Sequence, residues 1–541
     1  MSITLNKIFY TQIIIVILMI LGIMPQEASY LILVIVSYGF YKLSLLDSLG
    51  LFIISLPFFT ALPENRFSDS MSVWRILIAV LFLKMVVEAH NVKFSGRGLA
   101  DAAKAISKSF SEMKEKSYGK LFFLFILFLA INFLSLFAAQ YIGAGIKKIL
   151  FISNIVLLFP IVQAATKSRE DVLLVMRYLL KCSLIVVFVG YFQLVLTFFT
   201  PLFKFWMFWA GGVIEVFYGQ TLSGLLKFSN TWFSYYEVLP ATLRMFSVFP
   251  DSHSFSLFVL MAIPLLLFFI IYEHGIKKNR LVLILPFYSL ALIFSGSRGV
   301  WAASVPAFII GIAYFADLGS KINSIRDLSR KIILAAKEKI NPKIIPLSIL
   351  IFFLVIPISS FVLRKNQEVQ LMRSGVDIGE LEEEAMFKRL MSISDLYDVS
   401  NKGRIEIWNR TIESINENYL LGVGVGNFPL VLDEKLSSAK MGSSAHSIYF
   451  DIAAETGVFG LLTFLLIIAE ILFFSLRLFR KELANDRMKI FAGAFFAYFF
   501  WIAVYGLFDV VLFNDKVLMF AVLVISVLYS LKGKYSIKHA Q

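Results

Sequence analysis

Residues 255–272 read FSLFVLMAIPLLLFFIIY and contain no charged side chain. A helix of about 18 apolar residues is long enough to cross the hydrocarbon core of a bilayer. The backbone N–H and C=O groups of such a span must pair within the protein, which a helix achieves by itself. This stretch therefore predicts a transmembrane helix.

The same pattern recurs along the whole chain. Of its 541 residues, 59% are hydrophobic and only 16% are charged, and the mean hydropathy is +0.80. So little polar surface cannot solvate a soluble globule of this length. We predict an all-α polytopic membrane bundle of about fourteen spans, near 9–24, 28–44, 46–62, 71–88, 120–139, 147–165, 172–198, 255–272, 281–295, 299–316, 345–363, 449–476, 489–509 and 515–531.

The positive charge predicts which way the bundle faces. Lys and Arg number 51, and cytoplasmic loops of membrane proteins carry an excess of them. With the amino terminus in the cytoplasm, the inward loops 89–119, 317–344 and 477–488 are basic, whereas the outward loops 25–29 and 509–514 are acidic. We therefore expect both termini in the cytoplasm.

This orientation predicts five sections. Residues 1–198 hold the first transmembrane helices, 199–254 form an outward loop rich in aromatic residues, 255–363 return to the membrane, 364–447 form a larger outward loop, and 448–541 hold the last helices. The two outward loops face away from ATP and nucleotide sugars. Chemistry there depends on a membrane-borne activated donor or on a gradient.

Composition also narrows the chemistry. The single Cys182 excludes disulfide frameworks and Cys-based zinc sites, and none of the five histidines lies in a His-Glu-x-x-His pattern. We predict a metal-independent mechanism without a cofactor. The net charge of +14 is explained by inward loops on anionic membrane lipids, so no nucleic-acid partner is predicted.

Two acidic residues lie inside a predicted span. Asp451 and Glu455 are one helical turn apart in the span 449–476. Ionisable residues within a bilayer are functional candidates. We consider two roles for these residues: each pairs with a cation from a neighbouring helix, or each takes up a proton.

Three arginines lie at the predicted outer face. Arg298 sits in the Ser-Gly-Ser-Arg-Gly turn between two spans, Arg404 lies in the larger outward loop, and Arg244 shortly precedes His253. A guanidinium binds phosphate oxygens in a bidentate manner and keeps its charge. These residues suit a phosphate or pyrophosphate headgroup, and the alternative is that each caps a helix or pairs with a carboxylate such as Glu406.

His446 begins the span 449–476 at its outer end. An imidazole has an ordinary pKa of about 6.5, so it can accept a proton from a hydroxyl nucleophile near neutral pH. The alternative is an interfacial histidine at a helix start.

The order of these motifs along the chain resembles the order in a known protein family. His446-Ser447 is followed by nine residues, Gly457, two more and Gly460. This pattern follows the Arg298 turn, a Gly-Arg-x-x-x-Trp segment at Arg404 and a Gly-x-Gly-x-Gly segment. In this order the motifs resemble the O-antigen ligase and polymerase superfamily of bacterial membrane glycan transferases.

The resemblance covers roughly residues 240–475. It implies a helical glycosyltransferase of the GT-C type, which moves a glycan from an undecaprenyl-pyrophosphate donor to a hydroxyl of a glycan or lipid A-core acceptor. The site would face outward from the inner membrane, and the enzyme would need neither metal nor nucleotide sugar. It further implies that Arg298 and Arg404 bind the donor pyrophosphate and that His446 orients or deprotonates the acceptor, with Arg244 and His253 lining the same vestibule.

Two activities fit these motifs. The histidine-glycine pattern favours a ligase of lipopolysaccharide or surface polysaccharide biosynthesis. The many spans and the insertion at 364–400 leave an O-antigen or exopolysaccharide repeat-unit polymerase open, working with polysaccharide assembly proteins. A lipid-linked oligosaccharide transporter is less favoured, because it would show internal repeats and broken helices around a central charged site.

Overall fold

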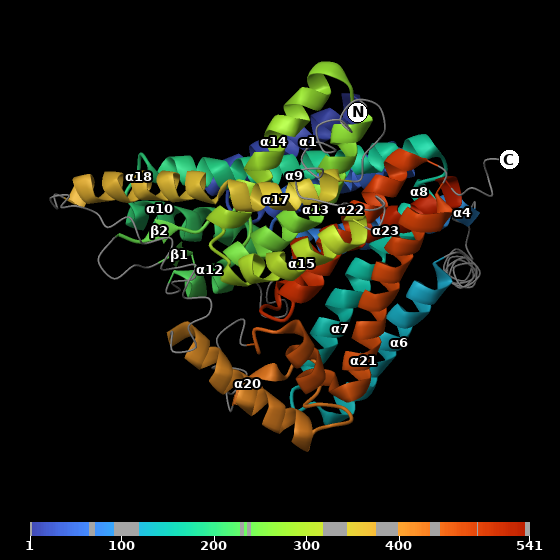
Figure 1. The fold of residues 1–541 in the computed structure, drawn as a ribbon. Coiled ribbons are helices and arrows are strands. Elements are labelled where there is room, and N and C mark those ends of the chain that lie inside the picture. Colours follow the sequence, from blue (N-terminus) through green and yellow to red (C-terminus); the bar gives the residue numbers. More distant parts are fainter. Residues whose placement is uncertain are drawn as a thin grey trace.

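The computed structural model describes residues 3–63, 71–90, 118–227, 232–234, 240–316, 343–374, 399–432, 444–483 and 485–535. Most of the insertion at 364–400 and most of the basic loops 89–119 and 317–344 fall outside these residues. Figure 1 shows a bundle built almost wholly of helices. The all-α prediction is therefore confirmed.

The helices are α1 (Ile3–Ile20), α2 (Ala28–Lys42), α3 (Leu45–Ser55), α4 (Val73–His90), α6 (Gly119–Ser135), α7 (Ile142–Val156), α8 (Leu158–Ala165), α9 (Arg169–Thr197), α10 (Leu202–Phe208), α11 (Glu215–Tyr218), α12 (Gln220–Leu226), α13 (Ser252–Tyr272), α14 (Gly275–Phe294), α15 (Arg298–Ala316), α17 (Ile344–Leu354), α18 (Ile356–Ser374), α20 (Val399–Glu417), α21 (Ile448–Arg477), α22 (Asp486–Tyr505) and α23 (Asp515–Tyr535). Short 3₁₀ or π segments are η1 (Leu56–Phe58), η2 (Leu136–Ala138), η3 (Trp209–Ile214), η4 (Phe428–Leu432), η5 (Leu478–Glu482) and η6 (Val511–Phe513). A two-residue antiparallel pair joins β1 (Phe233–Ser234) to β2 (Thr242–Leu243).

Each predicted span overlaps one helix or two abutting helices. In the described part of the chain, nine helical segments are long and apolar enough to cross a membrane, and three shorter apolar helices accompany them. Helices α4 and α14 each carry three charged side chains. The positions of the helices are confirmed, whereas the number that crosses the bilayer stays a prediction.

The outer surface of the bundle is unusually apolar. Phe123, Leu150, Phe188 and Leu462, each within a helix, are 51–70% exposed. A soluble protein rarely leaves so many large apolar side chains in water. The chain is an integral membrane protein whose exposed rings and aliphatic groups face lipid.

Helix α13 forms the centre of this bundle. It packs against α9, α14, α22 and α23. Of the most apolar 18-residue stretch of this helix, 94% is buried inside the protein. The side chain of Asp251 accepts a hydrogen bond from the backbone N–H of Ser254 at 2.7 Å and so caps the first turn. The fully apolar stretch 255–272 is thus a protein-lined core helix, and the residues before it lie where the candidate site forms.

Helix α21 runs beside α6 but is broken (Figure 1). Gly457 has φ 67°, and a Cβ atom there would lie 2.1 Å from the carbonyl oxygen of Leu420. At the break, the N–H of Val423 donates to the Ala454 carbonyl at 2.8 Å, and the N–H of Val458 donates to the Tyr419 carbonyl at 3.0 Å. The loop after α20 therefore supplies the hydrogen bonds that the interrupted helix lacks.

Candidate functional site

Four chain segments meet at one end of the bundle. They are the first turn of α13, the 295–298 turn before α15, the 444–447 segment before α21 and the 506–510 segment after α22. The N–H of Ile448 donates to the Gly506 carbonyl at 2.9 Å, which ties the last two together. A site built here draws on residues more than 250 positions apart in the sequence.

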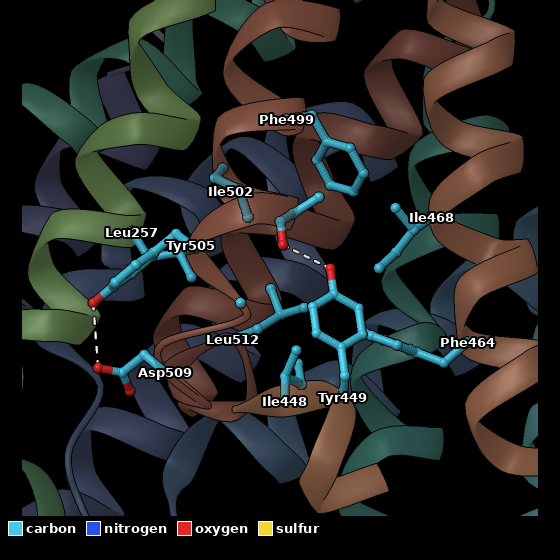
Figure 2. Close-up of a pocket in the computed structure, with 12 residues that line it drawn as sticks. Leu257, Ile448, Tyr449, Phe464, Ile468, Phe499, Ile502, Tyr505, Asp509 and Leu512 are labelled. Carbon is cyan, nitrogen blue, oxygen red and sulfur yellow. Dashed lines mark hydrogen bonds between the residues drawn. The ribbon is translucent and has the colours of Figure 1, made fainter. Parts of the chain in front are cut away.

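His253 lies at the junction of these segments. Its Nδ1 is 3.0 Å from Ser297 Oγ, 3.1 Å from Tyr505 OH and 3.0 Å from Asp509 Oδ2. The Tyr505 hydroxyl also donates to Asp509 Oδ2 at 3.4 Å (Figure 2). One imidazole nitrogen therefore joins three separate elements into a single polar cluster.

The three predicted arginines surround this cluster. Arg244, Arg298 and Arg404 each interact electrostatically with His253, and each side chain is partly buried. Arg404 also acts on His446. The structure thus gathers the five residues that the sequence singled out, although they come from separate elements.

Local backbone geometry places Arg244 beside the Arg298 turn. Gly296 has φ 63°, and a Cβ atom there would lie 3.1 Å from Cγ of Arg244. Nε of Arg244 donates to Ser234 Oγ at 3.2 Å. A glycine in the left-handed region therefore lets the Arg244 stem pack on the turn that precedes Arg298.

His446 is the second imidazole of the site. Burial lowers its pKa from the ordinary value, and interactions with Arg404 and His253 lower the pKa further, whereas Asp509 opposes both effects. A lowered pKa keeps the imidazole neutral near pH 7. His446 is then in the form that accepts a proton.

Asp509 is a site residue that the sequence did not reveal. It appeared there only as an acidic residue in a short outward loop, and no motif marked it. Burial raises the pKa of its carboxyl group, while interactions with His446 and Arg404 act in the opposite direction. Asp509 is thus an acidic group that contacts His253 and acts electrostatically on His446.

An apolar pocket adjoins the cluster (Figure 2). Tyr505 and Asp509 lie at one side of it, and Phe464 and Ile468 of α21 lie at the other. The Tyr449 hydroxyl donates to the Ala503 carbonyl at 2.6 Å and links α21 to α22. The polar cluster therefore borders directly on side chains of the membrane interior.

The structure also separates the roles of the two intramembrane acids. Glu455 Oε2 lies 2.5 Å from Nζ of Lys148 on α7. Asp451 Oδ1 accepts the backbone N–H of Ala445 at 2.6 Å. Glu455 therefore has the cationic partner from a neighbouring helix that the sequence left open, and Asp451 holds the segment that carries His446.

The match to known proteins falls on this region. Residues 281–465 match the family model described as O-antigen ligase. Over these residues the chain is similar to the O-antigen ligase family. The matched region includes Arg298, Arg404 and His446, whereas Arg244, His253 and Asp509 lie outside it.

This match confirms the resemblance to the O-antigen ligase and polymerase superfamily. It indicates a glycosyltransferase-like membrane enzyme acting on lipid-linked glycan and a polysaccharide acceptor. A search of curated proteins finds no match to the chain. The division into five sections and the roles of the site residues stay predictions.

Proposed function

We propose that this chain transfers a glycan from undecaprenyl pyrophosphate to an acceptor hydroxyl at the outer face of the bacterial inner membrane. The observation that carries the proposal is the convergence of three arginines on two partly buried histidines at one end of a membrane bundle. A positive-inside orientation with cytoplasmic termini turns that end outward.

The arginines suit the donor headgroup. Arg244, Arg298 and Arg404 provide permanent positive charge that does not depend on pH. A pyrophosphate gains negative charge as the bond to the sugar breaks, and fixed cations stabilise that charge in the transition state. Arg298 and Arg404 bind the pyrophosphate. Arg244, which follows β2, adds a third positive charge beside them.

His446 suits the acceptor. Its neutral imidazole takes the proton of the acceptor hydroxyl while the oxygen attacks the anomeric carbon. The bond from that carbon to the phosphate oxygen breaks, and undecaprenyl pyrophosphate leaves with the electron pair. Asp509 stabilises the imidazolium that forms, and a single displacement inverts the anomeric configuration.

We favour a ligase over a polymerase because the segment from His446 to Gly460 follows the histidine-glycine pattern of ligases. A repeat-unit polymerase uses the same donor and the same displacement, so the cluster serves either activity. Lipid A-core is the acceptor in the first case, and a second lipid-linked glycan is the acceptor in the other.

The broken helix α21 raises the transporter alternative again, since transporters use such breaks. At this break, however, backbone groups of the Tyr419–Val423 loop fill the gap, and Lys148 pairs with Glu455. The arginines instead act on His253 in the first turn of α13. These contacts favour a transferase.

The first test is deletion of the gene in its native host, with surface and lipid-linked glycans resolved by size. Long chains stranded on the polyprenyl carrier, with none on lipid A-core, support a ligase. Single repeat units on the core without long chains support a polymerase. Unchanged glycans of both kinds would contradict the proposed function.

A further inference from the structure

His446 has an unusual backbone conformation. Its φ is 51°, and among the described non-glycine residues only Ser247 also has a positive φ. Residues other than glycine uncommonly adopt this region, because Cβ crowds the backbone, and asparagine, aspartate and histidine do so more often than the rest. Such a conformation persists only where surrounding contacts hold it, and it is frequent at functional sites.

The contacts that hold it converge on the peptide groups of the preceding residue. The indole Nε1 of Trp408 donates to the carbonyl oxygen of Ala445 at 2.7 Å. The backbone N–H of Ala445 donates to Asp451 Oδ1 at 2.6 Å. Ala445 is fully buried, so both backbone groups depend on these side chains and not on water.

The two side chains belong to the elements that carry the chemistry. Trp408 lies one helical turn after Arg404 on α20, and its ring meets Phe450 of α21 edge to face at 5.9 Å. Asp451 lies in the first turn of α21. The Ala445 clamp, defined as Trp408, Ala445 and Asp451, therefore joins the Arg404 helix to the His446 turn.

We propose that Trp408 and Asp451 are positioning residues that hold the His446 imidazole at the distance from Arg404 that glycan transfer requires. The inference rests on the proposed function and deepens it. Neither side chain contacts substrate. Both act through the backbone of Ala445, so their loss slows the chemical step and leaves donor binding nearly unchanged.

Asp451 serves in this clamp as a hydrogen-bond acceptor. The neighbouring Glu455 already has the ion pair with Lys148. An amide oxygen accepts the same N–H, so Asp451→Asn preserves the clamp while removing the charge. Asp451→Ala removes the acceptor, and Trp408→Phe removes the donor but keeps a ring against Phe450.

The test uses the full-length chain in lipid nanodiscs. The donor is lipid-linked glycan extracted from the deletion strain, the acceptor is glycolipid from the same membranes, and released undecaprenyl pyrophosphate is measured by mass spectrometry. We expect Asp451→Ala to lower kcat about 100-fold and Trp408→Phe about tenfold. The KM for the donor stays within about twofold in both, and Asp451→Asn keeps kcat within about threefold.

Trp74→Phe is the matched control. It removes another indole hydrogen bond, from Trp74 Nε1 to Asp515 Oδ2 at 3.0 Å, in helix α4, which packs mainly against α2, α3, α7 and α8. Its kcat should equal that of the unsubstituted chain. Size-exclusion chromatography checks that each variant folds. If Asp451→Ala aggregates, the kcat of Trp408→Phe alone tests the positioning role.

Near-normal kcat in Trp408→Phe, or an equal loss in Asp451→Asn and Asp451→Ala, overturns the positioning role. If the unsubstituted chain releases no undecaprenyl pyrophosphate, the proposed function itself fails. If Arg404→Ala and His446→Ala are inactive while Trp408→Phe is normal, only the clamp is wrong.

Discussion

Helices α13 and α21 both contain long apolar runs, yet they do different things. Helix α13 holds no ionisable residue between Phe255 and Tyr272 and is surrounded by protein on nearly all sides. Helix α21 carries Asp451 and Glu455 and is interrupted at Gly457. Less than half of its most apolar stretch is buried inside the protein. The uniform helix organises the bundle, whereas the interrupted helix presents His446.

The largest expected effect tests whether the His446 end of α21 carries function. Arg404→Ala or His446→Ala should lower glycan transfer about 1,000-fold, since one removes a phosphate-binding cation and the other the proton acceptor. The measurement is release of undecaprenyl pyrophosphate, with membrane insertion checked by fractionation. Arg410→Ala is the matched control, because its i,i+4 pair with Glu406 is exposed and contributes little. Normal transfer by either active-site variant would refute the site.

A smaller effect tests the break itself. Gly457→Ala should lower the free energy of unfolding by about 2 kcal/mol or more, because φ 67° disfavours a side chain and the new Cβ would meet the Leu420 carbonyl. Thermal unfolding in detergent measures it. Gly533→Ala in α23 is the control, since a Cβ there meets nothing within 4 Å and alanine favours helix. Equal unfolding temperatures for the two variants would show that the break is not required.

The smallest effect concerns pH. Burial lowers the pKa of His446, so transfer should persist below about pH 6.5 and fall only as the imidazole is protonated at lower pH. The Asp509 carboxylate raises the pKa of His446, so Asp509→Asn should move this acid limb to still lower pH. The measurement is kcat/KM against pH, with exposed Glu406→Gln as the control. A shift in the opposite direction would contradict the assigned contact.

Much of the candidate site was visible in the sequence, because its residues occur in short local motifs. The turn at Arg298, the segment at Arg404 and the pattern that begins at His446 are each readable within a few residues. Asp509 and Lys148 have no such local signal. Their roles arise from contacts to His253 and Glu455, which are 256 and 307 positions away.

The sequence by itself determined the helical membrane fold, because apolar length and backbone pairing in lipid are local requirements. It also placed each helix that overlaps a predicted span, although only nine described segments meet the length and composition of a full span; α10, α11, α12 and α20 lie in the segments expected as outward loops. Only the tertiary structure decided that α13 is buried, that α21 breaks at Gly457, and that Ala445 is clamped from two helices. These features depend on packing between distant segments, and packing is set by the whole bundle rather than by any one run of residues.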